Sequence, residues 1–575
     1  MRIRQANTLI KALEKSANSY PDHKLAFALS RTRLEDLSFS QLALKSKCYA
    51  DGLRRLGLNK GDLVGLLLST RPEFILSFMG VIRGGGVPVP LPSYSGLQSL
   101  SGFSNRLEHI VEHSKSRYVI TEQKFLDMLR ESLGGLFLAQ HRVLTFEEIE
   151  AEGSPSSDVA LHSDDLCLVQ YTSGSTAAPR GVALTHRNVL ASLAAIAHGI
   201  EATDEDITSS WMPLFHDMGL IGLLCSIARG TTHYLYTQRS FIGNPGAWLH
   251  EFSRRGATIY KGPNFSYAHM IDNINDEQLS GLDLSLWRVA FNGSEPIDPF
   301  VVERFIERFS PYGFRPEAMM PVYGMAEATL AATFSPLGAA PLTRWFDSEG
   351  LANEGKAIRV SRFSRSAKGL VSVGKAVLDH TVRIVNDRGI ELPEACVGEI
   401  QIQGPAVMFG YYGDPEATKA VLRQGWLCTG DLGFISEGLL FITGRIKEMV
   451  IANGKKYYPQ DVEQIVRNVA GVYQGHCIAF GQAEDYTEHM SLAVETVLSS
   501  EAERTTLANK ILSLLTHQLG LSGVNIFLLK RGGIPRTSSG KYQRILFRDT
   551  FNQLEDALWT RSNCSEGKTE HSFEV

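Results

Sequence analysis

The segment Tyr171-Thr-Ser-Gly-Ser-Thr-Ala-Ala-Pro-Arg-Gly181 is rich in small and hydroxyl residues and follows the apolar run at 166–170. This order predicts a buried strand that leads into a loop of backbone and hydroxyl donors. Such a loop suits a polyphosphate ligand, because its N–H and O–H groups can converge on anionic oxygens. The competing interpretation is a flexible surface linker, since short motifs also arise by chance.

The residues after Gly181 separate this loop from a Walker A motif. A Walker A loop, G-x-x-x-x-G-K-[ST], opens directly into a helix. Here Gly181 is followed by Val182-Ala-Leu-Thr185, which reads as a second strand, and a helix is expected only from about Asn188. We therefore expect a phosphate loop that joins two strands.

Length and composition limit the class of protein. A chain of 575 residues exceeds one ordinary core and predicts two or more domains. Its 43% hydrophobic and 21% charged residues are typical of a globular chain in water. A net charge of −5 gives no general attraction for nucleic acid or an anionic membrane. Apolar runs are too short to span a bilayer and no signal peptide is apparent, so we expect a cytoplasmic protein without stable membrane insertion.

The order of short apolar runs and helical periodicity predicts an α/β fold. Strand-like runs at 62–69 and 86–91 flank a helical segment at 72–82, and this alternation continues to about residue 335. Between 371 and 442 the runs are strand-like and punctuated by glycine, which predicts a small β subdomain. From residue 444 a strand, a helix from Pro459 and further strands predict a compact α+β domain.

Two segments could hold a nucleotide base and a metal ion. Tyr323-Gly-Met-Ala-Glu327 offers a ring that can stack on a base and a carboxylate that can hold Mg²⁺ together with phosphate oxygens. In Asn292-Gly-Ser-Glu-Pro296 the backbone can approach a flat ring closely. The plainer interpretations are a helix start with an exposed glutamate and an ordinary strand-to-helix turn.

Two further segments could bind a sugar and deliver a cation. Asp431 follows a tight turn and could accept hydrogen bonds from both ribose hydroxyls, with Arg445 beside it. Lys541 ends a Gly- and Ser-rich loop 361 residues after Arg180, so a shared site requires one domain to fold over the other. The plainer interpretations are an aspartate that caps its own hairpin and a basic surface turn.

Taken in order, these segments resemble the motifs of the adenylate-forming superfamily of acyl-CoA synthetases, luciferases and peptide-synthetase adenylation domains. The matching motifs extend from residue 171 to residue 541. Residues 211–222, 241–249, 262–267, 292–296 and 344–374 look more specifically like the fatty acyl-AMP ligase branch.

The resemblance implies the architecture in more detail. We expect a large N-terminal adenylation domain at 1–443, built of layered α/β subdomains plus a β subdomain. A small, mobile α+β lid domain at 444–575 would follow, with a hinge near Lys447. An insertion at about 344–372 would hinder the domain motion that CoA chemistry needs.

The resemblance also implies an activity. The enzyme would use ATP and Mg²⁺ to convert a medium- or long-chain fatty acid into an acyl-adenylate, with release of pyrophosphate. The acyl group would then pass to an acyl carrier protein or to a carrier domain of a polyketide or peptide synthase. Two alternatives stay open: a fatty acyl-CoA synthetase, and a catalytically inactive relative that serves as a carrier-protein interaction module.

Site residues follow from the same resemblance. Lys541 would bridge the acyl carboxylate and the α-phosphate, Glu327 would hold Mg²⁺, and His216 would lie at the mouth of an acyl tunnel unless it is a structural histidine. The phosphate-binding residues would be Thr172, Ser173, Gly174, Ser175 and Thr176. The remaining nucleotide-binding residues would be Gly293, Ser294, Glu295, Pro296, Tyr323, Gly324, Met325, Asp431 and Arg445. The tunnel wall would include Met218, Leu220, Ile221, Asn264 and Phe265.

Two residues of the loop depart from the common pattern of the superfamily. Ala177 stands where glycine is common and lacks the freedom of glycine at positive φ. Arg180 stands where lysine is common, and it keeps the charge but replaces a compact ammonium by a flat guanidinium.

The role implied for Lys541 generates a first prediction. Lys541→Ala is expected to abolish acyl-adenylate formation while ATP still binds, because the cation would act on the transition-state charge rather than on nucleotide binding. Mass spectrometry of the adenylate and calorimetric titration of ATP measure the two effects separately. Adenylate formation by the variant at the wild-type rate would contradict the role.

Overall fold

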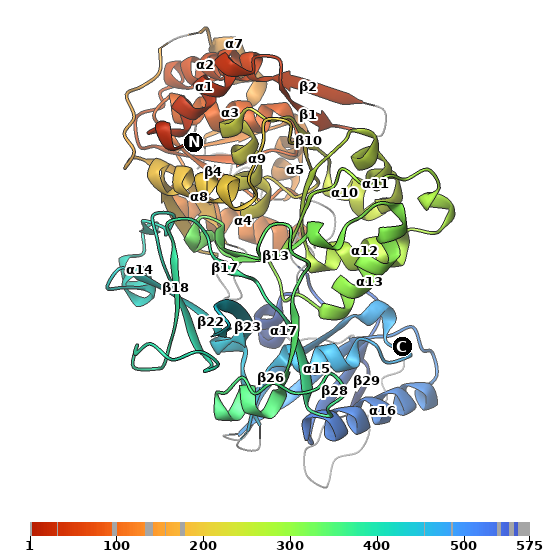
Figure 1. Cartoon of the computed structure of the whole chain (residues 1–575). Coiled ribbons are helices and arrows are strands. Elements are labelled where there is room, and N and C mark those ends of the chain that lie inside the picture. Colours follow the sequence, from red (N-terminus) through yellow and green to blue (C-terminus); the bar gives the residue numbers. More distant parts are fainter. Residues whose placement is uncertain are drawn as a thin grey trace.

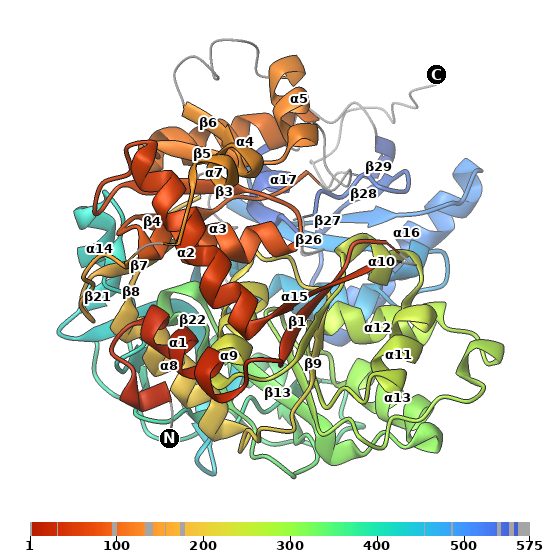
Figure 2. The same cartoon turned by 90° about the horizontal axis from the view of Figure 1, so that it is seen from above.

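A computed structural model describes residues 3–30, 33–94, 100–132, 142–155, 157–172, 179–452, 455–484, 487–536, 542–550 and 557–561. Figures 1 and 2 show a large part formed by residues up to about 440 and a smaller part formed by the residues after it. Within the described ranges, no helix is long and apolar enough to cross a membrane.

A nine-stranded sheet forms the centre of the large part. Its middle strands are parallel, and β2, β14 and β17 add antiparallel pairs at the two edges. The strand order is β17 (Lys375–Ala376), β14 (Ala331–Phe334), β13 (Met319–Gly324), β12 (Val289–Gly293), β11 (Ile259–Pro263), β9 (Thr208–Ser210), β10 (His233–Leu235), β1 (Lys24–Ala28) and β2 (Leu34–Ser38).

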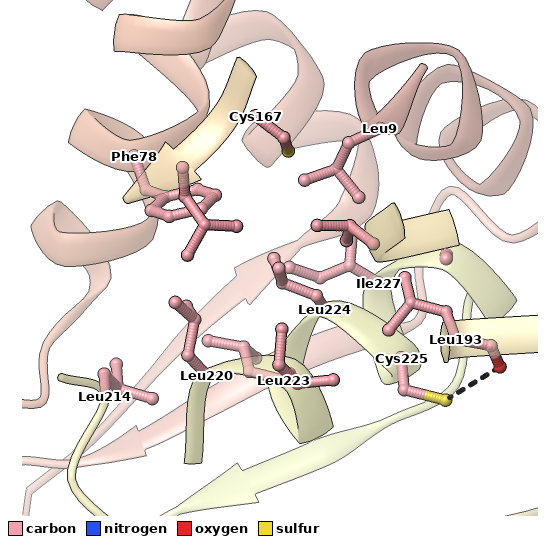
Figure 3. Packing of buried hydrophobic residues seen from close by; sticks show 14 of the residues in the cluster. Leu9, Phe78, Cys167, Leu193, Leu214, Leu220, Leu223, Leu224, Cys225 and Ile227 are labelled. Carbon is pink, nitrogen blue, oxygen red and sulfur yellow. Dashed lines mark hydrogen bonds between the residues drawn. The ribbon is translucent and has the colours of Figure 1, made fainter. Parts of the chain in front are cut away.

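Helices cover both faces of this sheet, because side chains of successive strand residues point to opposite faces. Tyr260 and Ala290 pack in a cluster with α11, α12 and α13, whereas Ile259 and Phe291 pack with α8 and α9 on the other face. Figure 3 shows the second face, where Leu220, Leu223 and Leu224 of α9 meet Leu9 and Phe78. The covering helices are α8 (His186–Gly199), α9 (Asp217–Arg229), α10 (Gln238–Gly243), α11 (Pro245–Arg254), α12 (Asn264–Asn273) and α13 (Pro299–Phe309).

Two smaller sheets adjoin the central one. The first is wholly parallel, with its strands buried as near-continuous apolar runs. Its order is β4 (Val87–Pro90), β3 (Leu63–Leu67), β5 (Tyr118–Thr121) and β6 (Arg142–Thr145). The second consists of β7 (Leu166–Tyr171), β8 (Gly181–Thr185) and β20 (Gly410–Tyr411). The helices around them are α1 (Leu9–Ser19), α2 (Phe39–Arg55), α3 (Pro72–Arg83), α4 (Leu100–Ser114), α5 (Gln123–Ser132) and α7 (Phe146–Glu152).

The predicted β subdomain and the predicted insertion lie next to each other. The subdomain contains β18 (Thr381–Val385), β19 (Gly398–Gln403), β21 (Leu422–Arg423), β22 (Trp426–Ser436), β23 (Leu439–Arg445) and the short helix α14 (Pro415–Val421). The insertion forms the hairpin of β15 (Thr343–Asp347) and β16 (Ala367–Val371), with a π-helical turn η6 (Gly350–Glu354) between them. Phe346 of the hairpin packs on Phe434 and Phe441 of the subdomain.

The residues after 449 have a core of their own, formed by Val462, Leu492, Ile511 and Ile526 among others. Figure 1 shows this part in blue, together with β15 and β16 that descend towards it. Its elements are β24 (Val450–Ala452), β25 (Lys455–Tyr457), α15 (Pro459–Val466), β26 (Cys477–Glu484), β27 (Thr487–Glu495), α16 (Glu501–Leu519), β28 (Asn525–Leu529), α17 (Arg544–Thr550) and β29 (Ala557–Arg561).

The predicted α/β class and the order of elements are confirmed. The two strands and the helix predicted on either side of the phosphate loop are β7, β8 and α8, and the helix predicted at 72–82 is α3. Residues 9–55 form the helices α1 and α2 with two strands between them. There β1 and β2 form an antiparallel pair, because β1 also adds in parallel to β10 of the central sheet.

The insertion also contacts the C-terminal part. Lys368 of β16 lies 2.5 Å from Asp461 of α15, and both side chains are about one-tenth exposed. The Lys368 ammonium also lies over the Tyr458 ring at 4.4 Å. A second pair, Lys455 with Glu349 at 2.7 Å, is solvent-exposed. The insertion is thus held to the C-terminal part by one buried and one exposed ion pair.

These two pairs generate a prediction about stability. Asp461→Asn leaves the Lys368 charge buried without a counter-ion and should lower the free energy of unfolding by about 3–5 kcal/mol. The matched control Lys455→Ala breaks the exposed pair and should change the free energy of unfolding far less, because solvent screens that pair. Urea denaturation measures the free energy of unfolding of both variants. Equal losses in the two variants would show that the buried pair stabilises the protein no more than the exposed pair does.

Candidate functional site

The carboxyl ends of β11, β12 and β13 meet at one edge of the central sheet. Open α/β sheets bind ligands outside the carboxyl ends of their parallel strands. Three predicted segments follow these ends directly: Asn264 after β11, Ser294 after β12, and Glu327 shortly after β13. The topology therefore gathers residues from distant parts of the sequence at a single edge.

A buried carboxylate joins this edge to the β subdomain. The Tyr323 hydroxyl donates a hydrogen bond of 2.7 Å to Oδ2 of Asp431, and Nε of Arg445 lies 2.8 Å from Oδ1. The Asp431 charge is the main cause that raises the pKa of Arg445. Burial, followed by the Asp431 charge, raises the pKa of Tyr323 well above its ordinary value. Tyr323 therefore stays a neutral hydrogen-bond donor to Asp431.

Glu327 lies at the start of the turn after β13, and its carboxylate has one partner that the sequence did not suggest. The Tyr411 hydroxyl donates to Oε1 of Glu327 at 2.8 Å, and the Arg180 guanidinium lies over the Tyr411 ring at 5.3 Å. Burial raises the pKa of Glu327, and the nearby Asp217 charge adds to the rise, whereas Tyr411 and Arg445 oppose it. Burial is the largest of these effects, so it outweighs the opposing ones and favours the neutral form of Glu327.

The two ends of the predicted phosphate loop are held together. Tyr171 and Gly181 are paired across β7 and β8, and the Thr172 N–H donates to the Arg180 carbonyl at 3.0 Å. The predicted phosphate-binding residues Ser173, Gly174, Ser175 and Thr176 lie outside the described residues, as do Ala177 and the predicted catalytic Lys541. The described ends fix where the loop leaves and rejoins the sheet, close to Tyr411 on β20.

His216 stands at the N-terminus of α9. The Met218 N–H donates to Oδ1 of Asp217 at 2.6 Å, and His216 Nδ1 lies 2.7 Å from the same carboxylate oxygen. The preceding Phe215 carbonyl accepts a hydrogen bond of 2.6 Å from Gln170 of β7, which ties the turn before α9 to the strand before the phosphate loop. His216 thus occupies the N-cap position of α9, and its part in the reaction stays a prediction.

The segment after β12 is shaped by close packing. A Cβ at Gly293 would lie 2.7 Å from a Val322 methyl and 2.8 Å from its carbonyl oxygen, so only glycine fits beside β13. Ser294 has φ of 66°, and its hydroxyl is 3.9 Å from the Met218 sulfur. The Glu295 carboxylate accepts the Phe265 N–H at 2.5 Å at the start of α12. The nucleotide-binding and acyl-binding residues predicted here are thus neighbours.

Gly324 shows why the β13 turn needs glycine. A Cβ at this position would lie 1.6 Å from the Leu330 carbonyl oxygen. Met325 is partly buried beside it, while Pro296 is exposed. What these residues bind stays a prediction, as it does for the other predicted ligand contacts.

The predicted tunnel residues separate into two groups. Met218, Asn264 and Phe265 lie near the end of β12, where Asn292 donates to the Asn264 side chain at 3.3 Å. Leu220 points instead into the core between α9 and the N-terminal helices, as Figure 3 shows, and Ile221 belongs to the same core cluster. A part for Leu220 and Ile221 in substrate binding stays a prediction.

The Glu327 carboxylate fits a magnesium ion that takes most of its other ligands from phosphate oxygens. Within the described ranges, no three His, Cys, Asp or Glu side chains gather closely enough to hold a metal alone. Mg²⁺ is commonly held by one or two carboxylates together with phosphate oxygens. A single partly buried carboxylate, with its pKa raised by burial, matches that pattern.

Sequence reasoning missed Tyr411 and Gln170 as members of the site. Tyr411 lies in Gly410-Tyr-Tyr412, which has no motif character, and only the pairing of β20 with β8 brings it beside Glu327. Gln170 is a polar residue inside an otherwise apolar strand, and that contrast was the one available signal.

Comparison with known proteins agrees with this geometry. Residues 13–412 match the family described as AMP-binding enzyme, and residues 454–548 match the AMP-binding enzyme C-terminal domain.

Two relatives and one solved structure are similar over nearly the whole chain. A Caulobacter vibrioides protein with the name of an acyl-CoA synthetase is 31% identical, covering 93% of this chain and 94% of its own. The medium-chain-fatty-acid–[acyl-carrier-protein] ligase JamA of Moorena producens is 31% identical, covering 96% of both chains. A structure from a study of fatty acyl-adenylate ligases of E. coli and L. pneumophila has a TM-score of 0.88 and 33% identity, covering 95% of this chain and 97% of that one.

Proposed function

Because the chain belongs to the AMP-binding enzyme family, we propose that it activates a medium- or long-chain fatty acid as an acyl-adenylate, with ATP as the second substrate. The single observation that carries the proposal is the convergence at one sheet edge of the Tyr323–Asp431–Arg445 group with the Glu327–Tyr411–Arg180 group. The similarity to fatty acyl-adenylate ligases supports a fatty acid as the acyl donor.

The first group suits the nucleoside part of ATP. The Asp431 carboxylate has further lone pairs that can accept hydrogen bonds from ribose hydroxyls, and its contacts with Arg445 and Tyr323 orient it. Only glycine fits at 293, so the backbone after β12 can pass close to a flat base. Tyr323, Gly324, Met325 and residues 293–296 are proposed to flank that base.

The second group suits the phosphates. The loop from Thr172 to Arg180 is proposed to bind the β- and γ-phosphates, which leave as pyrophosphate. Mg²⁺ held by Glu327 and phosphate oxygens would offset the negative charge of that leaving group. Arg180 is positioned by Tyr411 and brings a fixed positive charge to the end of the loop.

The reaction is an attack of the fatty-acid carboxylate oxygen on the α-phosphorus, with cleavage of the bond to pyrophosphate. Catalysis of such a step consists mainly of positioning and of stabilising charge on the phosphoryl oxygens. Lys541 is proposed to supply that charge from the C-terminal lid domain, which we place at 444–575 with a hinge near Lys447. His216 and Met218 are proposed to border the carboxylate.

The acyl group is proposed to pass to an acyl carrier protein or carrier domain, as the name of JamA states for that relative. A polyketide or lipopeptide pathway would be the setting. The second candidate function, a fatty acyl-CoA synthetase, is favoured by the name of the Caulobacter relative. The ion pairs that join the insertion to the C-terminal part oppose it, because they restrain the domain motion proposed for thioester formation.

One experiment tests the function. The protein is incubated with ATP, Mg²⁺ and a series of fatty acids, with and without CoA, and the products are identified by mass spectrometry. We expect acyl-adenylate and pyrophosphate in both conditions and no acyl-CoA. Stoichiometric acyl-CoA would favour the synthetase, and the absence of pyrophosphate with every acid would favour an inactive interaction module.

The raised pKa of Glu327 generates a pH prediction. Since a protonated carboxyl is a poor ligand for Mg²⁺, the affinity for Mg²⁺–ATP should fall as the pH is lowered through that pKa, beginning at a higher pH than for an ordinary glutamate. Glu327→Gln should bind more weakly above that pKa, approach the wild-type affinity below it, and lose this part of the pH dependence.

Calorimetric titration between about pH 8 and pH 5 measures the effect. Glu394→Gln serves as a control, because Glu394 accepts hydrogen bonds from an exposed hairpin turn of the β subdomain. A Glu327→Gln profile that parallels the wild-type profile would contradict the assignment of Glu327 as the metal ligand.

A further inference from the structure

A buried amine that the proposed mechanism does not use lies between α9 and the central sheet. Lys261 of β11 is 5% exposed, and its Nζ has no hydrogen-bond partner among the described residues. Burial lowers the pKa of this amine to about 7, with Cys225 as the nearby group that opposes the shift. A buried amine without a partner costs free energy whether it is charged or neutral.

Lys261 is directed at a gap in the surface of α9. Its neighbours in the sheet are Phe291 of β12 and the end of β9, and its side chain crosses to the helix at Gly222. A Cβ at Gly222 would lie 1.8 Å from Nζ and 2.4 Å from Cε of Lys261. The lysine therefore occupies space that exists only because residue 222 is glycine.

The other polar groups nearby do not neutralise the amine. His233 is fully buried, its Nδ1 lies 3.1 Å from the Ser226 hydroxyl, and its Nε2 has no partner among the described residues. Burial and the positive charge of Lys261 both lower the pKa of His233. Cys225 stays a thiol, because burial raises its pKa to about 11. In the part of the chain that the structure describes, no carboxylate pairs with Lys261.

Lys261 lies next to the proposed acyl-binding residues. Met218 and Gly222 are about one turn apart on the same face of α9, roughly 6 Å along its axis. Lys261 and Pro263 share one face of β11, and Pro263 immediately precedes Asn264 and Phe265. Met218 contacts Ser294 at the reacting edge. The Lys261 amine therefore lies about one helical turn further from the reacting edge than Met218 does.

We propose that Lys261 binds an oxygen-bearing group on the acyl chain of the substrate, such as a hydroxyl, a keto oxygen or a second carboxylate, a few carbons from the reacting carboxylate. This inference rests on the proposed function and specifies its substrate class. A plain alkyl chain beside Nζ leaves the amine unpaired, whereas an oxygen acceptor satisfies it. Sites that hydrogen-bond a substrate group discriminate strongly against analogues that lack it.

The test compares substrates in the full-length protein. Pyrophosphate release with ATP is measured for dodecanoic acid, for monohydroxydodecanoic acids with the hydroxyl at successive carbons, and for dicarboxylic acids of increasing length. We expect the wild type to prefer at least one oxygenated acid over the plain acid by at least about tenfold in kcat/KM.

Lys261→Met keeps the length of the side chain and removes the amine. We expect this variant to lose the preference and to use dodecanoic acid better than the wild type does. Its Tm without substrate should rise, because the unpaired buried amine is gone. The matched control Lys375→Met changes an exposed lysine of β17 and should keep the wild-type preference.

The outcomes separate the two proposals. Release of pyrophosphate from plain and oxygenated acids without preference in the wild type overturns the inference about Lys261 and leaves the proposed function standing. An equal preference in the wild type and Lys261→Met also overturns it. No release with any acid overturns the proposed function, and the inference falls with it.

Discussion

Asp431 is the buried carboxylate on which the arrangement of the site depends. It lies 108 residues after Tyr323 in the sequence, yet the two side chains are hydrogen-bonded, and Arg445 completes the group. Asp431 is only 4% exposed, and a buried carboxylate costs free energy unless a cation and a hydrogen-bond donor hold it. The end of β13 in the central sheet and the β22–β23 hairpin therefore have to meet at this point. The phosphate loop, Glu327 and the turn before α9 are then assembled around the same edge.

Local signals in the sequence predicted the parts of this assembly that depend on local structure. The strands β7 and β8, the helix α3 with its Pro72 start and the helix α15 with its Pro459 start follow from apolar runs and from the preference of proline for the first helical turn. The α/β class follows from the alternation of apolar runs and helical periodicity. That Tyr323, Glu327, Asp431 and Arg445 share one site was inferred from motif order, which depends on resemblance rather than on spacing alone.

What the sequence could not show depends on contacts between distant segments. The β1–β2 pair is short, and it exists because β10 offers a strand edge some two hundred residues later. Tyr411 and Lys261 carry no local signal, since a tyrosine in a turn and a lysine in a strand are usually exposed. Their importance appears only when β20 is paired with β8 and when α9 is laid over β11. Leu220, placed in the tunnel by resemblance, points into the core because it lies on the face of α9 opposite to Gly222.

Tyr411 gives the two halves of the phosphate site a shared part. One face of its ring supports the Arg180 guanidinium, and its hydroxyl holds the Glu327 carboxylate. A flat guanidinium stacks on a ring more fully than an ammonium does, so the arginine at this position and the tyrosine form a matched pair. During divergence of related chains, positions 180, 327 and 411 should consequently change in concert, and a swap of one position alone should be rare.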